Sequence, residues 1–213
     1  ESLGGTGNYI LSIAGHDSKP AATVYCFDSH GYAYDKIRTL KRVRGGVPCF
    51  DWISFDQIQW YRQSSRALRE IRKGHALPAL AFFHIPLREF ADPWLEKTVI
   101  GTAKEKNGYQ FLNSGMFTAF VEAGDVMGVF VGHYHDSDCV GSLWGVCLGY
   151  GRCSGFGSYG KLPRGARIIE LIEDRREFES WIREGDGKEV HRFRATDAEI
   201  EAKGVQPGPD KNP

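Results

Sequence analysis

The stretch VMGVFVGHYHDSD at residues 126–138 decides how the rest of the sequence is interpreted. Its first part, 126–131, is a continuous apolar run that is too short for a typical helix and fits a strand buried on both faces. Gly132 ends the run, and His133 and His135 follow at once. Two imidazoles in one tight turn can point at one or two metal ions, because neutral imidazole is a common ligand for zinc and iron. Such a pair also occurs by chance in surface turns, so alone it is weak evidence for a metal site.

A second apolar run, PALAFF at residues 78–83, ends in the same way, with His84 directly after it. In open α/β sheets, ligands collect outside the carboxyl ends of the strands. Two strand ends would therefore deliver three imidazoles to one place. The alternative for His84 is a core or helix-capping histidine before Ile85 and Pro86, and the joint pattern favours the metal site.

The sequence before these runs predicts a hairpin and a long helix. Residues 8–14 and 22–28 are rich in β-branched and aromatic side chains, which indicates two paired strands. Ser54 and Gln57 form a capping-box pattern, and apolar residues recur at helical spacing after them. We therefore expect a helix that begins after Ser54 and ends at Gly74.

The sequence around and after the second run predicts short elements of both kinds: a helix at 116–122, one strand at 143–150, a glycine-rich loop at 151–160, and two strands at 166–173 and 178–184. The remaining residues are polar, and Thr196 with Glu199 could cap a short helix near 196–202. We expect one domain over residues 1–183 and a polar C-terminal extension over 184–213.

Composition excludes several classes of partner. The 213 residues contain 27 Lys+Arg and 27 Asp+Glu, so the formal net charge is zero and no long-range field would attract nucleic acid or an anionic membrane. No stretch approaches the roughly 18 apolar residues of a membrane span. The five cysteines show no CxxC spacing, which predicts neither a zinc knuckle nor a full disulfide framework. We expect a soluble chain with a small-molecule partner, no nucleic-acid partner and no membrane association.

Several segments together resemble a known family. The segments FFHIPLREF at 82–90 and VFVGHYHDSD at 129–138 resemble the late motifs of calcineurin-like metallophosphoesterases, and more closely those of the Dcr2 and plant purple-acid-phosphatase-29-like branch. Further segments fit the same branch: 5–11, 25–32, 117–138, 150–160 and 164–167. The resemblance covers about residues 5–172.

The resemblance implies a fold, a reaction and a set of ligands. The fold would be α/β (α+β), the C-terminal half of a four-layer αββα sandwich. His84 and His133 would bind one metal ion and His135 a second, the pair being divalent or trivalent ions of iron, manganese or zinc. The intact protein would hydrolyse a phosphomonoester or phosphodiester, either a small molecule or a phosphoprotein. Many members of the family are exported, which favours a periplasmic or secreted location.

Other residues near the histidines have two possible roles each. Asp136 and Asp138 could orient the imidazoles, as outer carboxylates commonly do, or could be solvated loop acids. Arg152 could clamp a phosphate or pair structurally. Three residues depart from the usual pattern of the branch: Arg88, Tyr134 and Ser137. Tyr134 stands where Asp is frequent, which bears on substrate access and makes this residue a further candidate.

The family also uses three earlier motifs, DxH, GDxxD and GNH, which this sequence does not contain in order. Residues 28–30 have the DxH spelling, but the other two motifs do not follow. Gly124 and Asp125 fail GDxxD and are expected to turn the chain into the next strand, and Asn8 precedes Tyr9 instead of His. We expect that the first half of the domain precedes Glu1 in a longer protein, so no catalytic residue is assigned here. Without that half, a broad apolar face should be exposed.

The sequence leaves two other functions as alternatives. A truncated or degenerate phosphoesterase fold could bind a partner or a single metal ion without turning over substrate. An unrelated HxH hydrolase, such as an amidohydrolase, would place its histidine pair after its first strand, and the order in this sequence is different.

Overall fold

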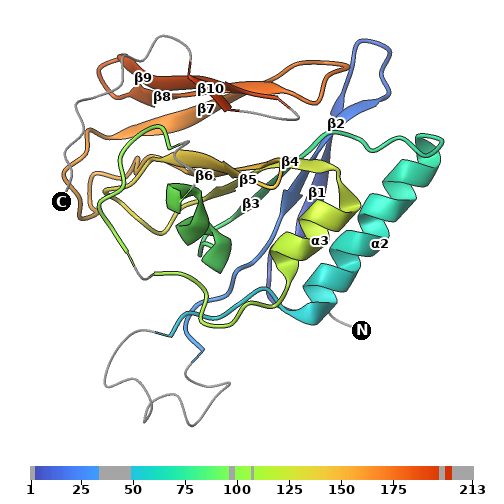
Figure 1. Cartoon of the computed structure of the whole chain (residues 1–213), viewed down its shortest axis with the longest axis horizontal. Helices are drawn as coiled ribbons and strands as arrows, with labels where there is room; N and C mark the ends of the chain where they lie inside the picture. Colours follow the sequence, from blue (N-terminus) through green and yellow to red (C-terminus); the bar gives the residue numbers. More distant parts are fainter. Residues whose placement is uncertain (1–2, 34–48, 96–98, 107, 197–199, 203–213) are drawn as a thin grey trace.

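The computed structural model describes residues 3–33, 49–95, 99–106, 108–196 and 200–202, and these form two sheets with helices on one side (Figure 1). The six-stranded sheet has the order β1-β2-β3-β4-β6-β5. Its strands are β1 (Tyr9–Ala14), β2 (Pro20–Cys26), β3 (Ala79–Phe83), β4 (Val126–Val131), β5 (Val140–Leu143) and β6 (Val146–Tyr150). The four-stranded sheet has the order β10-β9-β8-β7. Its strands are β7 (Gly165–Leu171), β8 (Phe178–Glu184), β9 (Glu189–Ala195) and β10 (Ile200–Ala202).

The centre of the six-stranded sheet is parallel. Strands β2, β3, β4 and β6 run in the same direction, and the antiparallel strands β1 and β5 flank them. The apolar runs became β3 and β4, as predicted, and every side chain of β4 is buried. Because β3 and β4 are parallel neighbours, the residues that follow them emerge at the same edge of the sheet.

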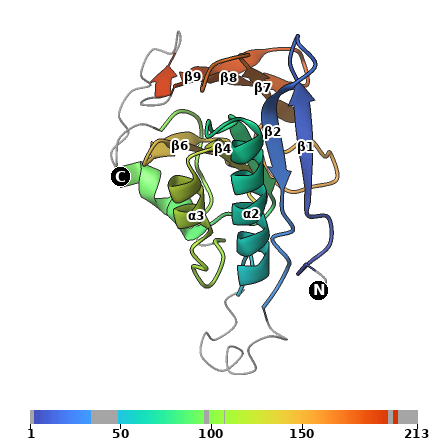
Figure 2. The same cartoon turned by 90° about the vertical axis from the view of Figure 1, so that its right-hand side faces the viewer.

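Two helices cover one face of this sheet, and the four-stranded sheet covers the other. The helices α2 (Phe55–Ile71) and α3 (Met116–Ala123) lie side by side (Figure 2). They bury aromatic side chains such as Tyr61 and Phe120 against the sheet. On the opposite face, Phe130 packs against Phe178 of the four-stranded sheet. A 3₁₀ segment, Arg88–Leu95, follows β3. No helix in the described ranges is long and apolar enough to cross a membrane.

The capping box at the start of α2 is confirmed, because the Ser54 backbone N–H donates to Gln57 Oε1 at 2.8 Å. The helix ends at Ile71, slightly before the predicted Gly74. Lys73 and Gly74 have φ values of 53° and 93°, and a left-handed backbone cannot continue a right-handed helix.

Asp125 anchors the helical layer to the sheet. This buried residue lies just before β4, and its carboxylate accepts hydrogen bonds from the hydroxyls of Tyr25 at 3.0 Å and of Tyr61. Burial raises the pKa of both tyrosines far above the usual range, so both remain neutral donors. Gly124 ends α3 in a left-handed conformation, as expected for a turn into the strand.

Two sequence predictions are wrong. The stretch 143–150 is not one strand, because Trp144 and Gly145 have φ values of 52° and 77° and form a two-residue hairpin loop between β5 and β6. The predicted helix near 196–202 is contradicted by β10, which pairs with β9. Within the segment predicted as an extension, β9 joins the sheet through β8 and buries Phe193 and Ala195. Its alternating buried side chains have the period of a strand.

Candidate metal centre

The three predicted metal ligands lie around one cavity at the carboxyl edge of the six-stranded sheet. His84 follows β3, and His133 and His135 follow β4. The cavity has a volume of about 750 Å³, and we call it the histidine cavity after these residues and His30, which also lines it. The ring centroids of His84 and His133 are 5.3 Å apart, and the two ring planes are nearly perpendicular. The structure therefore brings together side chains from two separate strand ends.

Close backbone packing holds the first two imidazoles. At Gly108, an added Cβ would lie 3.0 Å from Nε2 of His133, and at Gly132 it would lie 3.1 Å from Nδ1 of His84. His133 itself has a φ of 72°, an uncommon conformation for a residue with a side chain. The tight turn after β4 thus fixes where these rings point.

Both of these imidazoles are kept neutral. Burial, followed by the neighbouring His84, lowers the pKa of His133 to about 4. Burial, followed by His135, also lowers the pKa of His84 below the usual value. Metal binding requires a deprotonated imidazole nitrogen, so near neutral pH these side chains are ready to act as ligands.

The lowered pKa of His133 predicts that the chain loses stability as the pH falls. The unfolded chain, with an ordinary histidine pKa of about 6.5, binds more protons than the folded chain between about pH 6.5 and pH 4. The urea midpoint should therefore fall between about pH 7 and pH 5, and should fall less in His133→Ala. The exposed His75 provides the control, since His75→Ala should keep the full pH dependence. An equal fall in His133→Ala and the parent would contradict this origin.

His135 is held by the glycine-rich loop. The hydroxyl of Ser158 is 2.7 Å from Nδ1 of His135, and the ring of Tyr159 stacks on the imidazole with centroids 4.0 Å apart. Because Ser158 occupies Nδ1, Nε2 is the ring nitrogen left to bind a metal ion. No sequence pattern predicts these two contacts, because hydroxyl groups in a glycine-rich loop have many possible partners.

The two candidate aspartates contact groups other than the imidazoles. Asp136 accepts hydrogen bonds from the backbone N–H groups of Lys161 and Leu162, which lower the pKa of its carboxyl. Asp138 is fully buried and accepts the backbone N–H of Thr102 at 2.7 Å. Both carboxylates therefore connect the loop after β4 to neighbouring loops.

Arg152 and Tyr134 also make internal contacts. Arg152 donates to Asp138 at 2.6 Å, to Glu184 at 3.0 Å and to the carbonyl oxygen of Pro163 at 2.6 Å. This arrangement favours the structural role of its guanidinium over a phosphate contact. Tyr134 is buried, and its hydroxyl accepts the backbone N–H of Gly108 at 2.6 Å.

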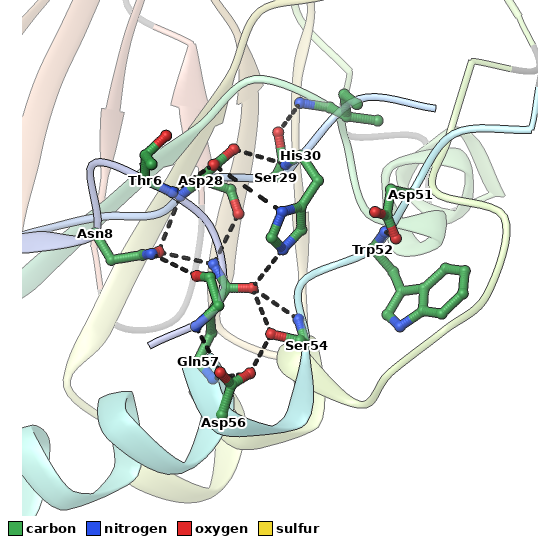
Figure 3. Close-up of polar contacts among 12 residues, drawn as sticks. Thr6, Asn8, Asp28, Ser29, His30, Asp51, Trp52, Ser54, Asp56 and Gln57 are labelled. Atoms are coloured by element: carbon green, nitrogen blue, oxygen red, sulfur yellow. Dashed lines mark hydrogen bonds and ion pairs between the residues drawn. The ribbon is translucent and has the colours of Figure 1, made fainter. Parts of the chain in front are cut away.

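The DxH-like residues 28–30 are arranged differently from the three histidines. Figure 3 shows His30 between Asp28 and Gln57. Nε2 of His30 is 3.0 Å from Gln57 Oε1, and Asp28 accepts the backbone N–H groups of Thr6 and His30. Ser29 Oγ accepts the backbone N–H that directly follows His84, at 2.8 Å. His30 thus lines the histidine cavity, while Ser29 holds the backbone that follows His84.

The donor set fits one wall of a metal site. Neutral imidazoles on a shared cavity are suitable ligands for zinc, iron or manganese. Within the ranges that the structure covers, however, no group of three or more His, Cys, Asp or Glu side chains is placed so that it could hold a metal ion by itself. A complete site would need carboxylates beyond those that the described residues bring to the cavity.

Comparisons with known proteins identify phosphatases among the proteins that this chain is similar to. No family model matches the sequence. The chain is 34% identical over 193 residues to "Probable inactive purple acid phosphatase 29" of Arabidopsis thaliana, covering 84% of this chain and 47% of the relative. It is 29% identical over 208 residues to "Phosphatase DCR2" of Saccharomyces cerevisiae, covering 90% of this chain and 34% of the relative. The chain thus spans about half the length, or less, of these curated relatives.

A solved structure shares the fold. A dimetal phosphatase from Danio rerio superimposes with a TM-score of 0.60 at 12% sequence identity, over 90% of this chain and 61% of the other. The match confirms the predicted class, a mixed α/β fold dominated by sheets, and it assigns the fold of a dimetal phosphatase.

Proposed function

We propose that this chain forms one wall of a dinuclear site that hydrolyses phosphoric esters in the intact protein. Its homologues are purple-acid-phosphatase-like proteins and the Dcr2 phosphatase, as expected for a calcineurin-like metallophosphoesterase. The observation that carries the proposal is the meeting of His84, His133 and His135 at one cavity. Two bound metal ions would supply an activated water and neutralise charge on the phosphoryl oxygens.

Each residue of the wall has a proposed role. His84 and His133 would hold one ion, and His135 would hold the other through Nε2. Tyr134 and Arg152 would fix the loops that carry these histidines. The ions would be iron, manganese or zinc, and the substrate a small phosphate ester or a phosphoprotein. Export of the protein remains a prediction from the family resemblance.

The missing carboxylates would come from the preceding half of the same domain. A cavity of about 510 Å³ lies between the two sheets, with Tyr9 and Phe82 on one side and Arg167 of β7 on another. On the edge strand β1, Leu11 is 53% exposed and Ile13 is 39% exposed. Among the described strands β7 pairs only with β8, so its other edge can accept a strand. We propose that strands from the preceding half pair with β7 and cover this apolar face.

A second candidate function is a non-catalytic module. The names of three relatives from Arabidopsis thaliana include the words "Probable inactive". Tyr134 also occupies a position where Asp is frequent in the branch. In that case the fold would bind a partner or a single metal ion without hydrolysis.

Metal content and hydrolysis of p-nitrophenyl phosphate, measured on the intact protein and on this chain, separate the two functions. We expect the intact protein to hold two metal ions and to hydrolyse the ester with added manganese. We expect this chain alone to show no hydrolysis, because no group of three or more His, Cys, Asp or Glu side chains among the described residues could hold a metal ion by itself. An intact protein that binds a single metal ion and hydrolyses no phosphate ester would favour the non-catalytic module. An intact protein that binds no metal would contradict both the site and the reaction.

A further inference from the structure

We infer that Glu105 is a positioning residue for His135, an inference that rests on the proposed role of His135 as a metal ligand. Glu105 lies on the loop at 99–106 and lines the histidine cavity. Its Oε2 accepts the backbone N–H of Asp136 at 2.6 Å, and its Oε1 accepts the hydroxyl of Tyr159 at 2.6 Å. One carboxylate therefore joins two segments that lie on either side of His135.

Backbone pairing brings Glu105 to this position. Ile100 pairs with Val140, and Ala103 pairs with Ser137, as in a short antiparallel ladder. The two segments run in opposite directions, so continuing this register places Glu105 opposite His135. The backbone N–H of Glu105 donates to Ser137 Oγ at 3.4 Å, and its side chain reaches the backbone N–H of Asp136. The position of Glu105 is thus fixed by the backbone and does not depend on a flexible side chain alone.

The contacts of Glu105 hold His135 from two directions. Asp136 is the next residue along the chain, so its backbone N–H fixes the peptide that follows the imidazole. Tyr159 covers the imidazole ring, and Ser158 beside it contacts Nδ1. If the carboxylate is removed, the loop and the stacked ring lose their shared acceptor together. Nε2 of His135 would then no longer be held toward the cavity.

The two hydrogen bonds are strong enough for this role. Hydrogen bonds to an ionised carboxylate are about twice as strong as neutral ones, and both are short. The donors are a backbone N–H and a phenol. Neither is a long cationic side chain such as Lys or Arg, whose loss of conformational entropy would offset the free energy gained from the hydrogen bond. Side chains that orient a metal-binding histidine typically contribute about 10–100-fold to metal affinity.

The test uses the intact protein with Co²⁺ alone as the probe, because the described residues form only one wall of the proposed site. It is combined with nitrogen NMR shifts of the His135 ring in this chain at alkaline pH. In Glu105→Ala we expect the Co²⁺ dissociation constant to rise about tenfold, and the two ring-nitrogen shifts to converge as the imidazole exchanges between tautomers. Glu105→Gln keeps an acceptor for Asp136 and should recover part of both effects. Glu122→Ala, which removes an exposed glutamate paired with Arg62, is the control and should change neither.

The outcomes separate this inference from the proposed function. If Glu105→Ala folds and keeps both His135 shifts and the parent affinity, Glu105 does not position the imidazole and the inference is overturned. If the intact protein binds no Co²⁺, the proposed metal site fails, while the NMR shifts of this chain still test the positioning. If Glu105→Ala does not fold, Tyr159→Phe removes only the hydroxyl and keeps the stacked ring, and the same shift changes decide.

Discussion

His133→Ala in the intact protein is expected to lose one of the two proposed metal ions and to lower kcat/KM for p-nitrophenyl phosphate by more than about 100-fold, since loss of a ligand should exceed the loss of an outer partner. The proposed site depends on neutral imidazoles, and burial beside His84 lowers the pKa of His133 to about 4. Metal content by mass spectrometry and steady-state kinetics measure the two effects.

The left-handed backbone at His133 calls for a second variant. Its φ of 72° is a conformation that asparagine tolerates better than alanine. His133→Asn should therefore keep the fold and still lose metal and activity, which separates ligand loss from backbone strain. The control is His75→Ala, at an exposed residue after α2, which should keep both metals. If His133→Ala retains two metals and full activity, the assignment of His133 as a ligand is wrong.

Arg152→Ala is expected to lower the free energy of unfolding by about 3–5 kcal/mol, measured by urea unfolding of this chain. Asp138 is fully buried, and Arg152 donates to it through both Nε and Nη2. Removing the guanidinium leaves a buried carboxylate without its cation. The loss should be partly recovered when Asp138→Leu is added to Arg152→Met, because an apolar pair of similar size avoids the unpaired charge.

An exposed ion pair provides the control for this prediction. Arg62 and Glu122 form a salt bridge with side chains that are 49% and 55% exposed, so Arg62→Ala should cost less than about 1 kcal/mol. If Arg152→Ala leaves stability unchanged but raises the KM for the phosphate ester in the intact protein, then the guanidinium contacts substrate and the structural role is wrong.

The elements that the sequence predicted well are those with a strong local pattern. The apolar runs at 78–83 and 126–131 became β3 and β4, and Ser54 with Gln57 opened α2. The hairpin within 143–150 was missed because Trp144 is as apolar as the strands around it, so no change in composition marks the turn. The strand β10 was missed because it takes its partner from β9, a contact that no local pattern specifies.

The candidate site also has a part that the local sequence pattern predicted and a part that depends on tertiary contacts. The sequence by itself determined that His84, His133 and His135 follow apolar runs with the character of buried strands. Because ligands collect at the carboxyl ends of strands in open α/β sheets, this was enough to predict that the imidazoles would meet. Only the tertiary structure decided that Ser158, Tyr159 and Glu105 surround His135, and that Arg152 pairs with Asp138. The physical reason is that apolar periodicity is a property of adjacent residues, whereas a hydrogen bond between loops depends on which backbone and side-chain groups the packed sheets bring within reach.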